Sequence, residues 1–171
     1  MKSNRKAGLL ASAVAIFIGF PEQSLLADTL VTHRIPAALA LEAVGEAVSV
    51  CAKQGYRVTA TVINPDGVRI ATLHGDGSGL HTIDASYAKA YAAVSFAAPV
   101  ANLETSGQLG EKYKDQPAFQ PPAGMLFRAG GVVIKQGNEV IGAIGVGGAP
   151  GAANDEICAR AGIDKIRDRV K

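Results

Sequence analysis

Residues 56–73 read YRVTATVINPDGVRIATL, and this stretch decides how the chain folds. Apolar and polar residues alternate on both sides of Asn64-Pro65-Asp66-Gly67, which is a strong turn signal. The stretch therefore predicts a β-hairpin with strands over Tyr56–Ile63 and Val68–Leu73. A second hairpin is predicted over Val132–Lys135 and Glu139–Val146, joined by a Gly-Asn turn.

Helical periodicity flanks both hairpins. Apolar residues recur at intervals of three and four over Pro36–Gln54, from Thr82 to about Pro99, and over Asp155–Arg167. Thr32 is the predicted N-cap of the first helix, and Thr82 or Asp84 that of the second. The proline-containing stretch 106–125 is predicted to be a long loop. Two antiparallel hairpins interleaved with helices indicate an α+β fold, a single layered domain with helices packed on one sheet.

The composition excludes several classes of protein. Of the 171 residues, 48% are hydrophobic and 19% are charged, which excludes an intrinsically disordered chain and fits one domain. The formal net charge is only +2, without the clustered basic face that nucleic-acid-binding proteins present. We therefore expect no nucleic-acid partner.

The N-terminus has the layout of a secretory signal. Lys2, Arg5 and Lys6 precede an apolar run over Ala7–Phe20, and Ala27 supplies a small residue for cleavage. A retained membrane anchor is the alternative, but a run of about 14 residues is short for a helix that spans a bilayer. We predict a signal peptide over residues 1–27, a mature domain over residues 28–171, no stable membrane insertion, and a periplasmic or secreted protein.

The chain has only two cysteines, Cys51 and Cys158. Export to an oxidising compartment favours a disulfide between them, and two buried free thiols on helix faces are the alternative. Neither cysteine lies in the Cys-x-x-Cys spacing of zinc sites.

Glycines are dense over Gly142–Gly148, where the sequence GAIGVGG suggests a nucleotide-binding loop. The spacing does not match the G-x-G-x-x-G fingerprint, and no Lys-Ser/Thr pair completes a P-loop. We interpret these glycines as small residues that let a strand approach a helix or a neighbouring subunit closely.

Imidazole and phenol side chains supply candidate ligands. His33 lies near the predicted start of the first helix, where a neutral imidazole can ligate a metal or haem iron. His74 and His81 bracket a glycine-rich loop, and Tyr87 and Tyr91 lie one helical turn apart. For the histidines the alternative is a solvated surface position, and for the tyrosines it is ordinary helix packing.

No arrangement of a nucleophile with a base is recognisable. Ser78 does not fit the G-x-S-x-G elbow of hydrolases, and turn or cap roles account for Asp76 and Asp84. Lys89 lies on an Ala-rich helix, either as a buried cation that faces the glycine-rich loop or as a surface side chain whose charged end reaches solvent.

Several motifs in this order resemble the GlcG/HbpS-like family of haem-binding proteins, which carry a haem-degrading domain. They are CAKQGY at 51–56, VINPDG at 62–67, DGSGLHT at 76–82, SYAKAY at 86–91, GNEVIGAIGV at 137–146 and DEICARAGI at 155–163. The resemblance runs from about Thr32 to Ile166. It implies a profilin-like antiparallel sheet of about five strands flanked by helices, assembly into homo-oligomers, often octamers, and binding of haem.

The chain departs from the family pattern at several polar positions. His74 stands where the family usually has Arg, Ala92 and Val100 stand where Thr is common, and Gly147 stands where Ser is frequent. The loss of three hydroxyls and a guanidinium weakens a prediction of catalysis more than a prediction of the fold.

Three functions follow from the residues and the resemblance. The first is an exported haem-binding protein that sequesters haem or iron or degrades haem. The second is a non-enzymatic oligomeric accessory module for a sensor or membrane protein. The third is a small-molecule enzyme with acid–base groups at Asp76, His81 and Lys89.

For the first function, the resemblance and the chemistry of haem select one candidate site. His33 is the candidate iron ligand, and Arg34 and Lys89 are candidate cations for the haem propionates. His81, Tyr87 and Lys89 are expected to line a second polar patch around the glycine-rich loop.

Overall fold

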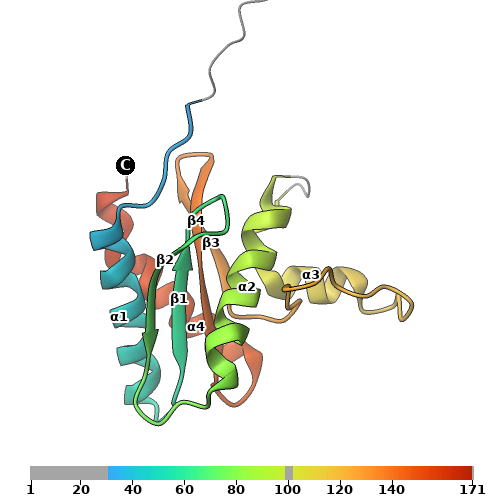
Figure 1. Ribbon diagram of the computed structural model, residues 1–171, viewed down its shortest axis with the longest axis horizontal. Helices are drawn as coiled ribbons and strands as arrows, with labels where there is room; N and C mark the ends of the chain where they lie inside the picture. Colours follow the sequence, from blue (N-terminus) through green and yellow to red (C-terminus); the bar gives the residue numbers. More distant parts are fainter. Residues whose placement is uncertain (1–30, 99–101, 171) are drawn as a thin grey trace, which may run out of the picture. The chain divides into compact units, whose positions relative to one another are not determined.

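One antiparallel sheet of four strands organises the protein (Figure 1). The computed structural model describes residues 31–98 and 102–170, so the predicted signal peptide lies outside the described residues. The strands are β1 Thr59–Ile63, β2 Arg69–His74, β3 Gly131–Gln136 and β4 Glu139–Gly147, in the order β2-β1-β4-β3. Both predicted hairpins are confirmed, and antiparallel pairing of β1 with β4 joins them into one sheet.

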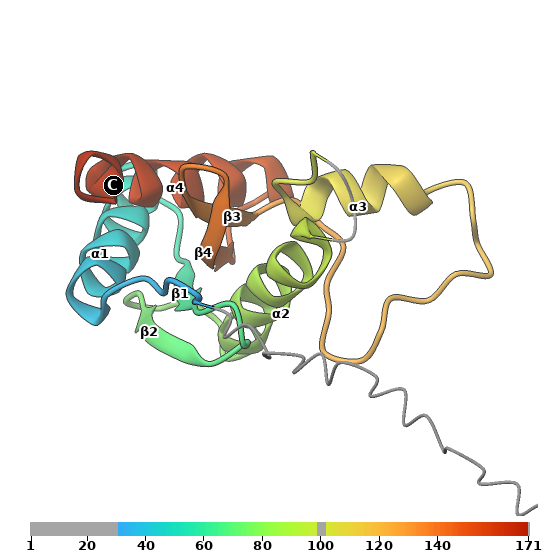
Figure 2. The same cartoon turned by 90° about the horizontal axis from the view of Figure 1, so that it is seen from above.

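Helices cover both faces of this sheet (Figure 2). They are α1 Ala37–Lys53, α2 His81–Ala97, α3 Ser106–Tyr113 and α4 Ala152–Ile166, and a 3-10 helix, Arg167–Arg169, follows α4. The helices α1 and α4 pack on each other over one face, and α2 packs on the other face against β1, β3 and β4. The α+β class is confirmed. No helix among the described residues is long and apolar enough to span a bilayer.

Two expectations about the middle of the chain are wrong. The described residues form four strands instead of about five, and the stretch 106–125 opens with α3. The side chain of Thr105 accepts from the N–H of Gln108, and the Gln108 side chain accepts from the N–H of Thr105. This capping box starts the helix. Thr105 also bridges Val132 at the edge of β3, but the chain turns into α3 at once, so the bridge does not extend into a fifth strand.

The predicted N-caps are also wrong. The helix α1 follows Pro36 without a side-chain cap, and Thr32 lies in the segment before it. The helix α2 begins at His81, one residue earlier than expected, and has no side-chain cap. The hydroxyl of Thr82 donates instead to the carbonyl of Gly79, in the preceding loop.

Two glycines let α2 lie directly on the sheet. A Cβ atom at Gly145 would lie 1.9 Å from the carbonyl oxygen of Ser86, and one at Gly131 would lie 2.1 Å from the carbonyl oxygen of Lys89. No side chain fits at these distances, so the close approach of helix and strand requires glycine at both positions. The packing interpretation of the glycine-rich stretch is confirmed.

A disulfide joins Cys51 of α1 to Cys158 of α4, as predicted, and the free-thiol alternative is wrong. Both cysteines are fully buried, and 107 positions separate them in the sequence. Closing a loop of this length stabilises the fold by about 4–5 kcal/mol in the chain-entropy model. The two helices on one face of the sheet are thus joined covalently.

Candidate functional site

His33 is held by Glu139, the first residue of β4, just before the chain enters α1. Its backbone N–H donates to Glu139 Oε1 at 2.9 Å, and its ring Nδ1 lies 2.6 Å from Glu139 Oε2. The hydrogen bond from the His33 backbone, and then that from its ring, lowers the pKa of Glu139 below its ordinary value. Because an ionised carboxylate only accepts hydrogen bonds, Nδ1 carries a proton and Nε2 is left for another partner.

Arg34 anchors the same segment to the other hairpin. Its Nε and Nη2 donate to Asp66 Oδ2 at 3.0 and 2.7 Å, and Asp66 belongs to the turn between β1 and β2. The side chain of Asn64 accepts from the backbone N–H of Asp66 and of Val68, which holds this turn in shape. The carboxylates of Glu139, at the start of β4, and of Asp66, on the β1–β2 turn, therefore position His33 and Arg34 at one end of the sheet.

A small pocket of about 180 Å³ opens beside His33 and Arg34. Leu39 and Ile141 supply apolar wall, and Val170 and Arg169 lie at its rim from the C-terminal segment. The guanidinium of Arg169 pairs with Glu42 of α1, which keeps it in place. An imidazole nitrogen, apolar wall and two guanidinium groups make a donor set suited to a flat anionic ligand that carries a metal. Among the described residues, no group of three or more His, Cys, Asp or Glu side chains can hold a bare metal ion.

The other three predicted site residues do not come together. His81 is exposed at the first residue of α2, with its ring against Gly79. The hydroxyl of Tyr87 donates to the carbonyl of Gly67 at 3.0 Å, and its ring stacks on Tyr91 with centroids 5.6 Å apart. The packing alternative for the tyrosine pair is therefore confirmed.

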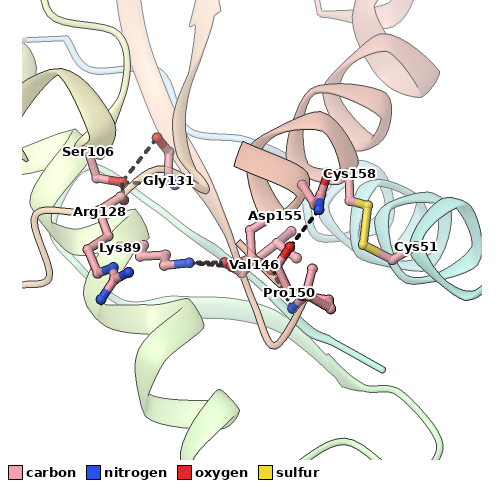
Figure 3. Close-up of polar contacts among 11 residues, drawn as sticks. Cys51, Lys89, Ser106, Arg128, Gly131, Val146, Pro150, Asp155 and Cys158 are labelled. Atoms are coloured by element: carbon pink, nitrogen blue, oxygen red, sulfur yellow. Dashed lines mark hydrogen bonds and ion pairs between the residues drawn. A yellow bond between two sulfur atoms is a disulfide. The ribbon is translucent and has the colours of Figure 1, made fainter. Parts of the chain in front are cut away.

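Lys89 lies in the interior and does not face the glycine-rich loop. Its Nζ donates to Asp155 Oδ2 at 2.6 Å and to the carbonyl of Val146 at 3.0 Å (Figure 3). The other oxygen of Asp155 accepts from the N–H of Ala149. The side chains of Lys89 and Asp155 are only 5% and 4% exposed, so this ammonium cannot reach a propionate. The expectation that Lys89 binds a propionate or lines a polar surface patch is corrected.

A buried hydroxyl network between the sheet and α2 was missed by the sequence analysis. Thr59 Oγ1 lies 2.6 Å from Thr82 Oγ1, and Thr61 Oγ1 lies 2.8 Å from Ser86 Oγ. Thr59 Oγ1 also lies 2.7 Å from Nδ1 of His74. The sequence did contain a signal for this network. Thr59 and Thr61 share one face of a strand, and Thr82 and Ser86 share one face of a helix, so each pair places two hydroxyls on one surface.

Breaking the pair of Lys89 with Asp155 should strongly destabilise the fold. We expect Lys89→Met to lower the free energy of unfolding by about 3–5 kcal/mol, because it leaves a buried carboxylate without a counter-charge. Adding Asp155→Leu should recover much of the loss. Urea unfolding measures both.

Lys135→Met is the matched control, because Lys135 pairs with Glu104 at the surface at 2.9 Å. Its cost should stay within about 1 kcal/mol. A cost of Lys89→Met as small as that of the control would contradict the role given to the buried pair.

The contact of His33 with Glu139 should be lost in acid. The folded-state pKa of Glu139 is lowered from the ordinary 4.5, so the stabilisation is present above that value and is lost as the pH falls through the lower folded pKa. The backbone amide shift of His33, followed by NMR from about pH 7 to about pH 3, should report this transition with a midpoint below the ordinary glutamate value. Glu139→Gln should abolish it, and a midpoint at or above that value would argue against the contact.

Comparison with known proteins identifies relatives over most of the chain. The family model for the haem degrading protein HbpS-like matches residues 35–164. A crystal structure of HbpS is 32% identical, with a TM-score of 0.71, and the match covers 81% of this chain and 93% of that one. A double mutant of HbpS from Streptomyces reticuli is 30% identical, with a TM-score of 0.71 and coverage of 90% and 97%.

More distant similarity concerns the fold alone. A PduOC–haem complex is 16% identical, with a TM-score of 0.66 and coverage of 78% of this chain and 95% of that one. No curated protein matches the chain. The family match covers the sheet, α1, α2, α3 and most of α4, while His33 and Arg34 lie just before it and Arg169 and Val170 just after it. On the grounds of this match and of the identity to HbpS, the chain belongs to the HbpS-like family of haem-degrading proteins.

Proposed function

We propose that this protein binds haem and that Nε2 of His33 is the axial ligand of the iron. The observation that carries the proposal is the contact of Glu139 with Nδ1 of His33 at 2.6 Å. Histidines that ligate metals donate their other ring N–H to a carboxylate, a carbonyl or water, which fixes the tautomer and makes the ligating nitrogen more basic. His33 has this arrangement, and its side chain is 57% exposed.

The surroundings of His33 fit the remainder of a haem. Leu39 and Ile141 offer apolar contact to the porphyrin. The guanidinium groups of Arg34 and Arg169, which pair with Asp66 and Glu42, offer their remaining N–H groups to its propionates. Val170 also lines a larger groove of about 380 Å³ between β3 and α4, so apolar surface continues past the pocket. Bound haem would supply the redox chemistry of its iron, and the residues described here bind and orient it.

The size of the pocket supports an oligomer. Its volume of about 180 Å³ is smaller than the roughly 300–1,000 Å³ usual for sites that enclose a small molecule. A haem bound to His33 would project from the surface, and a second copy of the chain could cover its outer face. We therefore propose a homo-oligomeric protein that sequesters haem or iron. The name of the family makes haem degradation the further activity to test.

Replacement of His33 should weaken the binding of haemin. We expect His33→Ala to lower its affinity at least about tenfold and to shift the Soret band, because the iron loses its protein ligand. Glu139→Gln should weaken haemin binding about 10–100-fold, the usual effect of losing the partner of a ligating histidine. Haemin titration of the purified protein measures both effects.

His81→Ala is the matched control, since His81 is also an exposed histidine and lies away from Glu139. It should leave haemin affinity unchanged. Equal affinities and Soret positions for His33→Ala and the unaltered protein would exclude His33 as the ligand.

We also propose that the protein is exported, with cleavage after Ala27. The charged start, the short apolar run and the small residue support this, and so does the disulfide, because disulfides persist in oxidising compartments. The intact mass of the exported protein should correspond to a chain that begins at Asp28. A species that begins at Met1 would rule out the cleavage.

A further inference from the structure

A cavity of about 370 Å³ opens at the end of α1 that lies away from His33 (Figure 1). Its walls come from the second half of α1, the segment before β1 and the loop after β2, and they include Val48, Ala52, Tyr56, Arg57, Gly75 and Asp76. Ala52 lies 13 residues after Leu39 of the pocket beside His33, a rise of about 20 Å along the helix, so the two sites are separate. The volume is in the range of roughly 300–1,000 Å³ that is usual for small-molecule sites.

Two glycines shape the wall of this cavity that belongs to the loop after β2. The N–H of Gly75 donates to the carbonyl of Val58 at 3.0 Å, and a Cβ atom at Gly75 would lie 2.7 Å from that oxygen. At Gly77, whose φ is +71°, a Cβ atom would lie 3.1 Å from Cδ and 3.3 Å from Nη1 of Arg57. Because neither glycine carries a side chain, the loop packs against β1 and the Arg57 side chain lies on the loop, next to the residue that carries the Asp76 carboxylate.

Arg57 and Asp76 line the cavity with opposite charges, and both charges are without a partner. Within residues 31–98 and 102–170, neither side chain makes a hydrogen bond or an ion pair, and the two do not pair with each other. The arginines of the pocket beside His33 differ in this respect, because Arg34 and Arg169 each hold a carboxylate of the chain. The guanidinium of Arg57 and the carboxylate of Asp76 are therefore both available to a ligand.

The loop also contains an unsatisfied hydroxyl. Oγ of Ser78 is buried and makes no hydrogen bond with the described part of the chain, and a Cβ atom at Gly75 would lie 3.5 Å from it. Buried hydroxyls nearly always have a partner, so this loop has hydrogen-bonding capacity that the rest of the chain does not use.

We propose that this cavity binds a free α-amino acid with an aliphatic side chain. The guanidinium of Arg57 binds the carboxylate, the carboxylate of Asp76 binds the ammonium group, and Val48 and Ala52 contact the side chain. A simple carboxylate would be repelled by Asp76 and a simple amine by Arg57, whereas a zwitterion is attracted to both. This site does not depend on the binding of haem.

Titration with L-leucine tests the site. L-leucine should shift the backbone amide signals of residues 75–78 in the ¹H–¹⁵N spectrum of the purified protein, and Arg57→Gln and Asp76→Asn should each weaken its binding at least about tenfold. Arg128→Gln and Asp115→Asn are the matched controls, because both residues are exposed and lie outside this cavity. They should leave the affinity unchanged. The absence of L-leucine binding in the unaltered protein would overturn the proposal.

Two truncated forms of leucine test the role of each charge. 4-Methylpentanoate lacks the ammonium group, so Arg57→Gln should weaken its binding and Asp76→Asn should not. Isoamylamine lacks the carboxylate, so the two variants should have the opposite effects. If Asp76→Asn weakens 4-methylpentanoate as much as it weakens L-leucine, Asp76 acts on the shape of the loop and the assignment of a zwitterion is wrong. Neither result affects the proposed binding of haem, which haemin titration tests separately.

Discussion

The ion pair between Lys89 and Asp155 connects the layers of this fold. Lys89 belongs to α2 on one face of the sheet, and Asp155 belongs to the first turns of α4, which packs on the other face. Two charges removed from water persist only where further hydrogen bonds satisfy both groups. The carbonyl of Val146 and the N–H of Ala149 do so at the point where β4 ends and the chain turns toward α4.

The disulfide extends this connection to α1. Cys158 lies three residues after Asp155, almost one turn along α4, and bonds to Cys51 of α1 (Figure 3). A continuous series of contacts therefore leads from α2 through the end of β4 and α4 to α1. This series includes an ion pair and a covalent bond. Salt weakens the ion pair little because both charges are buried, and it does not affect the disulfide. The ends of the sheet are left free to carry exposed groups.

The close packing of α2 on the sheet explains the network of buried hydroxyl groups between α2 and β1. Because Gly145 and Gly131 allow the backbones to approach, only small side chains fit between the helix and β1. Ser86 and Thr82 fill this space with hydroxyls, and buried hydroxyls need partners, which Thr59 and Thr61 provide. At the other end the turns carry carboxylates instead, and Glu139 and Asp66 hold the segment before α1. Each end thus orients one imidazole by a different polar group.

The sequence by itself determined the local elements and the class of fold. Alternation around Asn64-Pro65-Asp66-Gly67 and the spacing of apolar residues in the helices depend on neighbours in the chain, so both hairpins and three of the four helices could be predicted. The fourth, α3, was missed although Thr105 and Gln108 form a capping box, because prolines in the following stretch favoured a loop. The residue pattern predicted the four strands of the two hairpins, and the count of about five came only with the family resemblance.

Only the tertiary structure decided what each candidate residue does. The sequence left Lys89 either buried or at the surface, because its partner Asp155 is 66 residues away and no local pattern reports such a contact. His33 and Glu139 are 106 residues apart, and His74 depends on Thr59 and Thr82 from two other elements. The sequence could therefore name the imidazoles. The free nitrogen of each ring, and the burial of Lys89, follow from hydrogen bonds between residues that only folding brings together.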